Sequence, residues 1–302
     1  MIPEFPKFKK LELSDKKDIE KFTSKFPPYS DFNFYNMWAW DIHNKMVLSQ
    51  LNGNLVVLFN DYVNSEEFLA FLGEKRAAET ASILIAYSKD KHKKGFLKFV
   101  PEEVILAFKN LSFIVKADKD SFDYVYLVEH LAIMKNWHKN TSGKRIRRFL
   151  KTGIKYTIKH SSPEDITKDQ EKYKEFFKKW AEDKNIKDHY KLYEYKAFER
   201  FLTIKDKNIH FVTLFFGERM VGFTVYEILS KDYAVSHFAK ADKEHYAAIS
   251  DLLNWEEAKI LHAKGIKYFN WEQDLGIPGL RYAKEKYKPA FVFKKYIVSN
   301  RV

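Results

Sequence analysis

The sequence predicts an α+β protein in which mixed, mostly antiparallel sheets form two tandem domains. Its 302 residues are enough to build two hydrophobic cores, or one large one. Apolar residues make up 45% of the chain and aromatic residues 17%, which is typical of a globular protein rather than a disordered one. Strand-like segments are joined in pairs by tight turns and are interspersed with amphipathic helical segments. We expect the first domain to span residues 1–154 and the second residues 155–302.

The first half contains one strong hairpin signal. In the segment MVLSQLNGNLVVLF, two strand-like runs flank Asn52-Gly53, a pair that accepts the positive φ of a tight turn. Before this hairpin, Ser14 is expected to cap a helix that carries Ile19 on its apolar face. After it, the runs SFIVKAD and FDYVYLV are expected to be strands.

The second half has a more specific order of elements. In chain order we expect a helix (171–183), a long hairpin (208–229), a strand (233–239), a helix closed by Gly265 (247–265), a strand (266–272), a short helix and a final strand (290–298). This order and these lengths are those of the sheet of a GNAT-type acyltransferase. Pieces of the pattern also occur in other α+β domains.

Composition excludes several classes of chemistry. The chain has no cysteine, so disulfides, thiolate catalysis and cysteine-based zinc sites are ruled out. We find no HxxEH-like spacing and no acidic metal loop, and therefore expect no metal. With neither a signal peptide nor a long apolar run, a cytoplasmic location without a membrane span is expected. The net charge of +12 fits a polyanionic partner, but it fits a solvated lysine-rich surface equally well.

Special residues concentrate in one stretch near the end of the chain. Residues 272–279, EQDLGIPG, hold two glycines and a proline, although the whole chain has only ten glycines and eight prolines. Glu272 and Asp274 follow a strand end, where ligands commonly bind, and would point the same way in extended chain. Either carboxylate is a candidate to orient or deprotonate an acceptor. The alternative for Asp274 is to accept hydrogen bonds from the amides of the following turn.

Two cations and a tryptophan accompany these carboxylates. Arg281 and Lys284 are three residues apart on the helix after Gly279, so they share a face and could clamp a phosphate or carboxylate of the donor. Alternatively they are solvated, or paired with a nearby carboxylate. Trp271 either lines an acyl pocket or belongs to the core.

A second basic segment, SGKRIRRFLK, is expected to be an amphipathic helix. Its cationic face comprises Lys144, Arg147, Arg148 and Lys151, and its apolar face Ile146, Phe149 and Leu150. Such a face suits the phosphates of RNA or of lipid headgroups, since arginine holds phosphate in a fork. The alternative is a solvated helix face without a partner.

Three segments together resemble the phosphatidylglycerol lysyltransferase C-terminal domain family. They are EQDLGIPGLRYAKEKYKP (272–289), which is the specific part, FDYVYLVEHL (122–131) and KRIRRFLK (144–151). The resemblance spans nearly the whole chain. It implies two tandem GNAT-like acyltransferase domains with a shared cleft, as in the Fem aminoacyltransferases. Membrane-bound relatives transfer lysine from lysyl-tRNA to phosphatidylglycerol.

Two departures from these families bear on the donor. Ile146 stands where the basic helix of the family carries an asparagine. The segment KADKEHYAAI (240–249) lacks the glycine-rich pyrophosphate loop of ordinary GNAT enzymes, which argues against acetyl-CoA as a simple donor.

The expected function is therefore transfer of an aminoacyl group from aminoacyl-tRNA, or of an acyl group from acyl-CoA, to an amine or hydroxyl. No covalent enzyme intermediate and no tightly bound cofactor are expected. Glu272 would orient the acceptor, while Arg281 and the basic helix would hold the phosphates of the donor. Peripheral contact with anionic lipid is a further expectation. The alternative is a non-catalytic protein that binds RNA or a nucleotide ligand on an acyltransferase fold.

Overall fold

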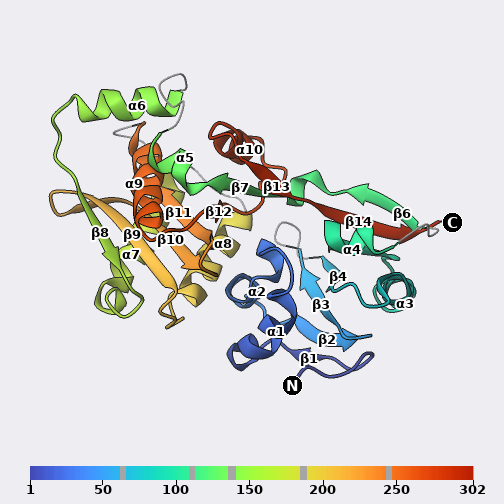
Figure 1. Cartoon of the computed structure of the whole chain (residues 1–302). Coiled ribbons are helices and arrows are strands. Elements are labelled where there is room, and N and C mark those ends of the chain that lie inside the picture. Colours follow the sequence, from blue (N-terminus) through green and yellow to red (C-terminus); the bar gives the residue numbers. More distant parts are fainter. Residues whose placement is uncertain (62–65, 109–112, 135–140, 184–188, 243–246, 302) are drawn as a thin grey trace. The chain divides into compact units, whose positions relative to one another are not determined.

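The computed structural model describes residues 1–61, 66–108, 113–134, 141–183, 189–242 and 247–301 (Figure 1). The chain forms two compact units. Unit 1 comprises Met1–Asp123, Gln273–Ile277 and Val292–Val302, and unit 2 comprises Tyr124–Glu272 and Pro278–Phe291. The chain therefore passes between the units four times.

This division differs from the expected boundary after residue 154, and long-range strand pairing is the reason. β7 (Asp123–Leu127) pairs with β12 (Tyr268–Asn270) and so places residues 124–154 with the second sheet. Conversely, β14 (Lys295–Asn300) pairs with strands of the first sheet. The sequence pattern predicts that residues 290–298 form a single strand of the second domain. Instead this segment forms β13 (Phe291–Phe293) and β14, which belong to different sheets.

Unit 1 is built on a seven-stranded sheet with the order β1-β2-β3-β4-β5-β14-β6. Its remaining strands are β1 (Lys9–Lys10), β2 (Val47–Leu51), β3 (Asn54–Asn60), β4 (Glu67–Leu72), β5 (Phe96–Pro101) and β6 (Phe113–Ala117). Its helices are α1 (Lys16–Thr23), α2 (Phe34–Trp40), α3 (Ala77–His92) and α4 (Glu102–Leu106), with 3₁₀ turns at Leu13–Asp15, Ser30–Phe32 and Lys119–Ser121. Only β4 and β5 pair in parallel among the neighbours described.

The core of unit 1 lies where α3 covers this sheet. Leu84 and Ile85 of α3 pack with Leu69, Leu97 and Val298 from three neighbouring strands. The predicted hairpin is confirmed, because Asn52 and Gly53 both have positive φ between β2 and β3. Ser14, in contrast, lies within a 3₁₀ turn, and α1 begins one residue after Asp15, which is its N-cap.

Unit 2 is built on the order β13-β7-β12-β11-β10-β9-β8. Its further strands are β8 (Thr157–Ser161), β9 (Ile209–Phe216), β10 (Arg219–Ile228) and β11 (Tyr233–Ala241). Its helices are α5 (Val128–Ala132), α6 (Thr141–Leu150), α7 (Gln170–Asp183), α8 (His189–Phe201), α9 (Ile249–Ala263) and α10 (Pro278–Glu285), with a 3₁₀ turn at Thr167–Asp169. β11 and β12 are parallel, whereas β7–β12, β8–β9, β9–β10 and β10–β11 are antiparallel.

Helices cover both faces of this second sheet (Figure 1). On one face, Leu253 of α9 lies against Gly222 of β10. On the other, Tyr173 of α7 and Phe198 of α8 contact the ring of Phe223, which is the next residue of β10 and so points the opposite way. Helices thus bury the sheet on both faces, which restricts the side chains that its inner positions can accommodate.

None of the helices in the described part of the chain is both long enough and apolar enough to cross a membrane.

Candidate functional site

The sheet of unit 2 opens where its two parallel strands part. β11 pairs with β12 only over Tyr233–Val235 and Tyr268–Asn270. Beyond Asn270 the chain leaves β12, while β11 continues to Ala241. Ligands of α/β proteins commonly bind at such openings at the carboxyl ends of parallel strands. The residues that follow the paired segments are therefore the first candidates for a site.

His237 lies at this opening, on a β-bulge of β11. Its neighbours Ser236 and Phe238 pair with Tyr226 and Val225, so His237 is left over between two consecutive partners on β10. A bulge changes the direction of a side chain and often occurs beside an active site. The imidazole is fully buried, and its ring lies 4.7 Å from the ring of Phe201 on α8.

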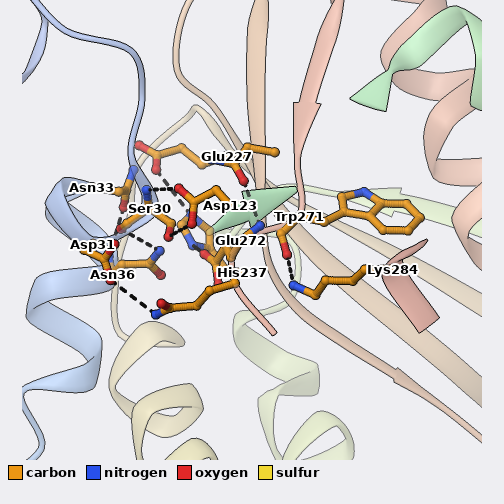
Figure 2. A network of polar contacts seen from close by, with 12 residues as sticks. Ser30, Asp31, Asn33, Asn36, Asp123, Glu227, His237, Trp271, Glu272 and Lys284 are labelled. Carbon is orange, nitrogen blue, oxygen red and sulfur yellow. Dashed lines mark hydrogen bonds and ion pairs between the residues drawn. The ribbon is translucent and has the colours of Figure 1, made fainter. Parts of the chain in front are cut away.

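Two carboxylates hold the imidazole of His237 (Figure 2). Its Nε2 lies 3.3 Å from Oε2 of Glu227 on β10, and its Nδ1 lies 3.4 Å from Oε1 of Glu272. Burial disfavours the imidazolium cation, but hydrogen bonds and charge from both carboxylates outweigh it and raise the pKa of His237 to about 9. A cationic histidine between two carboxylates therefore exists at neutral pH. Glu272 is the more exposed carboxylate, with 18% of its side chain accessible.

The backbone of Glu272 is fixed in an unusual conformation. Its φ is 58°, and its N–H donates to Oδ1 of buried Asn270 at 2.7 Å. Trp271 N–H donates to the carbonyl of Tyr124 at 2.9 Å, and Tyr124 N–H donates to the carbonyl of Glu272 at 3.1 Å. A non-glycine residue in this region costs on the order of 1–3 kcal/mol and tends to occur at functional sites. The loop thus aims the Glu272 carboxylate at His237.

Asp274 has a different environment, because the chain enters unit 1 after Glu272. Its side chain is fully buried, and its Oδ1 accepts the backbone N–H of Gly276 at 2.8 Å. This is the capping contact that the sequence offered as the alternative. The positive φ of Glu272 interrupts the extended backbone on which the expected alignment of the two carboxylates depended.

Trp271 and Lys284 lie together on the unit 2 side of this loop (Figure 2). The ammonium of Lys284, which is buried on α10, donates to the carbonyl of Trp271. The indole packs against Tyr126 at 4.3 Å and Tyr287 at 5.0 Å between ring centroids, and its buried N–H has no hydrogen-bond partner among the described residues. Arg281 is half-buried on the same helix as Lys284.

The basic helix is α6, and most of its predicted faces are correct. Ile146 and Phe149 are buried, and the cations Lys144, Arg148 and Lys151 are exposed, with Arg147 half-buried. Leu150, which was expected on the apolar face, is 43% exposed. It is the last residue of α6, beyond the part of the helix that packs on the unit.

An acidic residue of α9 ties α6 to the rest of unit 2. The carboxylate of Asp251 is buried and lies 3.7 Å from Arg145 of α6. It also accepts a hydrogen bond from Lys286 at 2.7 Å and one from the hydroxyl of Tyr287. Since the Tyr287 ring contacts Trp271, packed side chains link the basic helix to the loop that carries Glu272.

Unit 1 contains a buried ion cluster of its own (Figure 2). Lys295 at the start of β14 is fully buried and pairs with Asp31 and with Asp123, whose Oδ1 lies at 2.7 Å. Asp123 also accepts hydrogen bonds from the hydroxyl and the backbone N–H of Ser30, at 2.6 and 2.7 Å. Gln273, the residue after Glu272, donates to Asp31 at 3.2 Å. This cluster anchors the loop in unit 1.

Comparison with known proteins decides the family. The model of the family described as phosphatidylglycerol lysyltransferase, C-terminal, matches residues 24–299. The chain belongs to the phosphatidylglycerol lysyltransferase C-terminal domain family. Among curated protein sequences none gives a significant match.

Solved structures similar to this lysyltransferase-family chain share its fold. A conserved protein of unknown function from Bacteroides thetaiotaomicron VPI-5482 is 24% identical over 100% of both chains, with a TM-score of 0.75. L-PGS from Bacillus licheniformis is 14% identical over 99% of this chain and 94% of that one, with a TM-score of 0.62. FemX is 8% identical over 98% of this chain and 97% of that one, with a TM-score of 0.58. The expected α+β class with tandem GNAT-like sheets is confirmed, and family and fold are those of acyltransferases.

Sequence reasoning missed several members of these clusters in the lysyltransferase-family chain. Glu227 was not singled out, although a carboxylate within the apolar strand GFTVYEIL is an unusual choice. Lys295 gives a similar signal within FVFKKYIV, but its partners Asp31 and Asp123 are distant in sequence. The structure shows His237 to be a buried partner of two carboxylates.

Two expectations concern groups that bind metals or anions. Among the described residues, no group of three or more histidine, cysteine or acidic side chains is arranged so that it could hold a metal ion. The segment 240–249, which lacks the glycine-rich pyrophosphate loop, lies partly outside the described residues, at 243–246.

Proposed function

We propose that this protein transfers an aminoacyl group from aminoacyl-tRNA to an amine or hydroxyl acceptor at the opening between β11 and β12. The proposal is supported by the family match and by the resemblance to L-PGS and FemX. The absence of glycine in residues 240–249 favours an RNA donor over acyl-CoA, because a pyrophosphate is usually held by a glycine-rich turn.

The observation that carries the proposal is the pair formed by buried His237 and partly exposed Glu272. Glu272 receives the acceptor, accepting a hydrogen bond from its amine or hydroxyl and then its proton. His237 is a positioning residue, since it is fully buried and acts only through the carboxylates on either side. Glu227 completes the arrangement by holding the second ring nitrogen.

The reaction requires no enzyme-bound intermediate. The acceptor nitrogen or oxygen attacks the ester carbonyl of the donor, and a tetrahedral intermediate forms. The bond to the ribose oxygen then breaks, the ribose hydroxyl regains a proton, and the new amide or ester is released. Positioning of the two reactants supplies much of the rate in such transfers.

The cations of unit 2 hold the donor in this proposal. Lys144 and Arg148 present positive charge on α6, Lys151 directly follows this helix, and Arg145 of α6 lies 3.7 Å from Asp251. Arg281 lies on α10, in the stretch that carries the family resemblance, while Lys284 of the same helix holds the carbonyl of Trp271 and so fixes the loop beside the donor. We assign Trp271 to the wall of the donor site, next to the carboxylate that receives the acceptor.

The test compares donors and then variants of one carboxylate. Purified protein is incubated with charged tRNA, uncharged tRNA, acetyl-CoA or longer acyl-CoAs, and melting temperature and acyl transfer to amines or to phosphatidylglycerol vesicles are measured. We expect transfer only from charged tRNA, and a loss of at least 100-fold in Glu272→Gln, the order expected when a general base is removed. Glu285→Gln, an exposed position on α10, is the matched control and should retain full activity.

Other outcomes separate the competing functions. Stabilisation by charged and uncharged tRNA alike, with no transfer, would indicate a non-catalytic RNA-binding protein. Transfer from an acyl-CoA would show that the donor is acyl-CoA instead of aminoacyl-tRNA, while the proposed site would stand. Transfer that is equally fast in Glu272→Gln and in the wild type would remove Glu272 from the mechanism.

A further inference from the structure

An aromatic stripe crosses four neighbouring strands of unit 2 at the end of β12 away from Glu272. Tyr233 of β11 is the direct partner of Tyr268 of β12, and Tyr268 is the direct partner of Leu127 of β7. Phe291 of β13, the next strand along, contacts Tyr268 with 5.5 Å between ring centroids. These four residues are called the aromatic stripe below.

The rings of the stripe are ordered but not buried. Tyr233 and Tyr268 are stacked, with 4.8 Å between centroids and 27° between planes, and Phe291 meets Tyr268 edge to face at 68°. Tyr233, Tyr268 and Leu127 are half-buried, and Phe291 is 37% exposed. A packed core would bury such rings, so part of their surface remains open to a ligand.

Positive charge borders the stripe. Lys267 is exposed, and its ammonium lies 5.0 Å from the centroid of the Tyr268 ring. Lys231, two residues before Tyr233, is also exposed, while Asp232 between them is half-buried. Flat rings beside ammonium groups on a protein of net charge +12 match a ligand that carries both flat faces and negative charge.

We propose that the aromatic stripe binds single-stranded RNA by stacking of its bases, with Lys267 and Lys231 on the neighbouring phosphates. Sheet faces with exposed aromatic rings bind single-stranded nucleic acids in this way, because every base has a flat face and an unpaired strand can splay its bases. Double-stranded RNA offers phosphates but no free bases, so it is not expected to engage the rings.

The stripe deepens the proposed function and rests on it for its biological meaning, since it would hold an unpaired segment of the RNA donor. Tyr268 and Glu272 are four residues apart, roughly 13 Å along extended chain. Both belong to unit 2, so one unit carries both the stripe and the proposed acceptor carboxylate.

The experiment measures binding of RNA that carries no aminoacyl group, so its result is independent of transfer activity. Fluorescence anisotropy is recorded with a labelled single-stranded oligocytidylate and with an RNA duplex of equal length. In Tyr268→Leu, which keeps an apolar side chain on β12, we expect affinity for the single strand to fall roughly 5- to 100-fold, as for the loss of one stacked base. Affinity for the duplex should not change. Lys267→Ala should reduce the salt dependence of single-strand binding.

Tyr282→Ala is the matched control, because Tyr282 is 64% exposed on α10 of the same unit but is not part of the stripe. Its affinity should equal that of the wild type, and thermal melting should show that all variants are folded. The inference is overturned if wild type and Tyr268→Leu bind the single strand equally, or if wild type binds duplex and single strand equally. The inference is also overturned if the wild type binds an apolar peptide but no RNA, and Tyr268→Leu no longer binds that peptide.

Discussion

Nδ1 of His237 lies 3.4 Å from Oε1 of Glu272, and the two residues come from the two parallel strands at the point where they part. Neither strand alone creates this pair. A bulge on β11 directs the histidine, and a left-handed backbone conformation after β12 directs the carboxylate.

This pair predicts that stability falls in alkaline solution. The folded state raises the pKa of His237 from 6.5 to about 9, so the protonated form is favoured by folding. That stabilisation is complete below about pH 6.5 and is lost as pH rises through about 9. Urea unfolding at several pH values should show a fall of about 3 kcal/mol across this window in the wild type. In His237→Gln the histidine's share of this fall should be absent, so above about pH 8, where the Glu257 contribution has ended, the stability should change little; an unchanged pH profile would contradict the assignment.

Glu257 of α9 predicts an unusual stabilising substitution. Its side chain is fully buried, one carboxylate oxygen has no hydrogen-bond partner among the described residues, and burial raises its pKa from 4.5 to about 8. Folding favours the neutral form of this carboxyl group, so the free energy of unfolding decreases as pH rises from about 4.5 through 8. Glu257→Gln should therefore be more stable than the wild type by about 4 kcal/mol near pH 8, as measured by chemical denaturation. Near pH 4.5 the two proteins should differ little.

The ion cluster of unit 1 should be fragile to single changes. Lys295→Met leaves Asp31 and Asp123 buried without their cation, which should lower the free energy of unfolding by about 3–5 kcal/mol. A triple variant, Lys295→Met with both aspartates changed to asparagine, should recover much of this loss in urea unfolding. If the single variant is as stable as the wild type, the cluster does not stabilise the unit.

Two glycines of the EQDLGIPG stretch should respond differently to alanine. Gly276 has a φ of 70°, and a Cβ there would lie 2.9 Å from a carboxylate oxygen of Asp120. Gly276→Ala should therefore destabilise the protein by about 1–3 kcal/mol. Gly279 lies within α10, and a Cβ there would meet no atom within 4 Å. Gly279→Ala is the control, and thermal melting should show little change or a slight gain.

A histidine pair on β8 and β9 predicts the opposite dependence on pH. The rings of His160 and His210 are 5.0 Å apart, and His160 shares a hydrogen bond of 3.0 Å with the hydroxyl of Tyr226. Burial lowers the pKa of His160, and burial with the charge of His160 lowers that of His210 to about 4. The stability that these neutral rings contribute should be lost as pH falls from 6.5 through about 4. NMR titration of the ring protons tests whether the pKa values of both histidines are lowered; a pKa near 6.5 for His210 would contradict the prediction.

Much of the fold was predictable because its signals are local. Asn52-Gly53 marks a hairpin whatever surrounds it, and the helix that ends just before Gly265 follows from apolar periodicity and the left-handed conformation of that glycine. The limits of the two units were not predictable in this way. They depend on which strands β7 and β14 join, and strand partners that are distant in sequence leave no local pattern.

The candidate site shows the same division. Glu272 stood out because it follows a strand and precedes a rare cluster of glycine and proline. Its partner Glu227 lies 45 positions earlier, on a strand that reads as apolar core. A bulge at His237 brings His237, Glu227 and Glu272 together, and no residue type in YAVSHFA predicts a bulge.

The position of β14 between β5 and β6 has a consequence for synthesis of the chain. The sheet that begins to form first, from the amino-terminal strands, cannot be completed until residues 295–300 have left the ribosome. Until then β5 and β6 lack the strand that joins them, and Asp31 and Asp123 lack their lysine. Unit 2 has nearly all of its strands before that moment, so the sheet whose strands are made first is the last to receive its full set of strands.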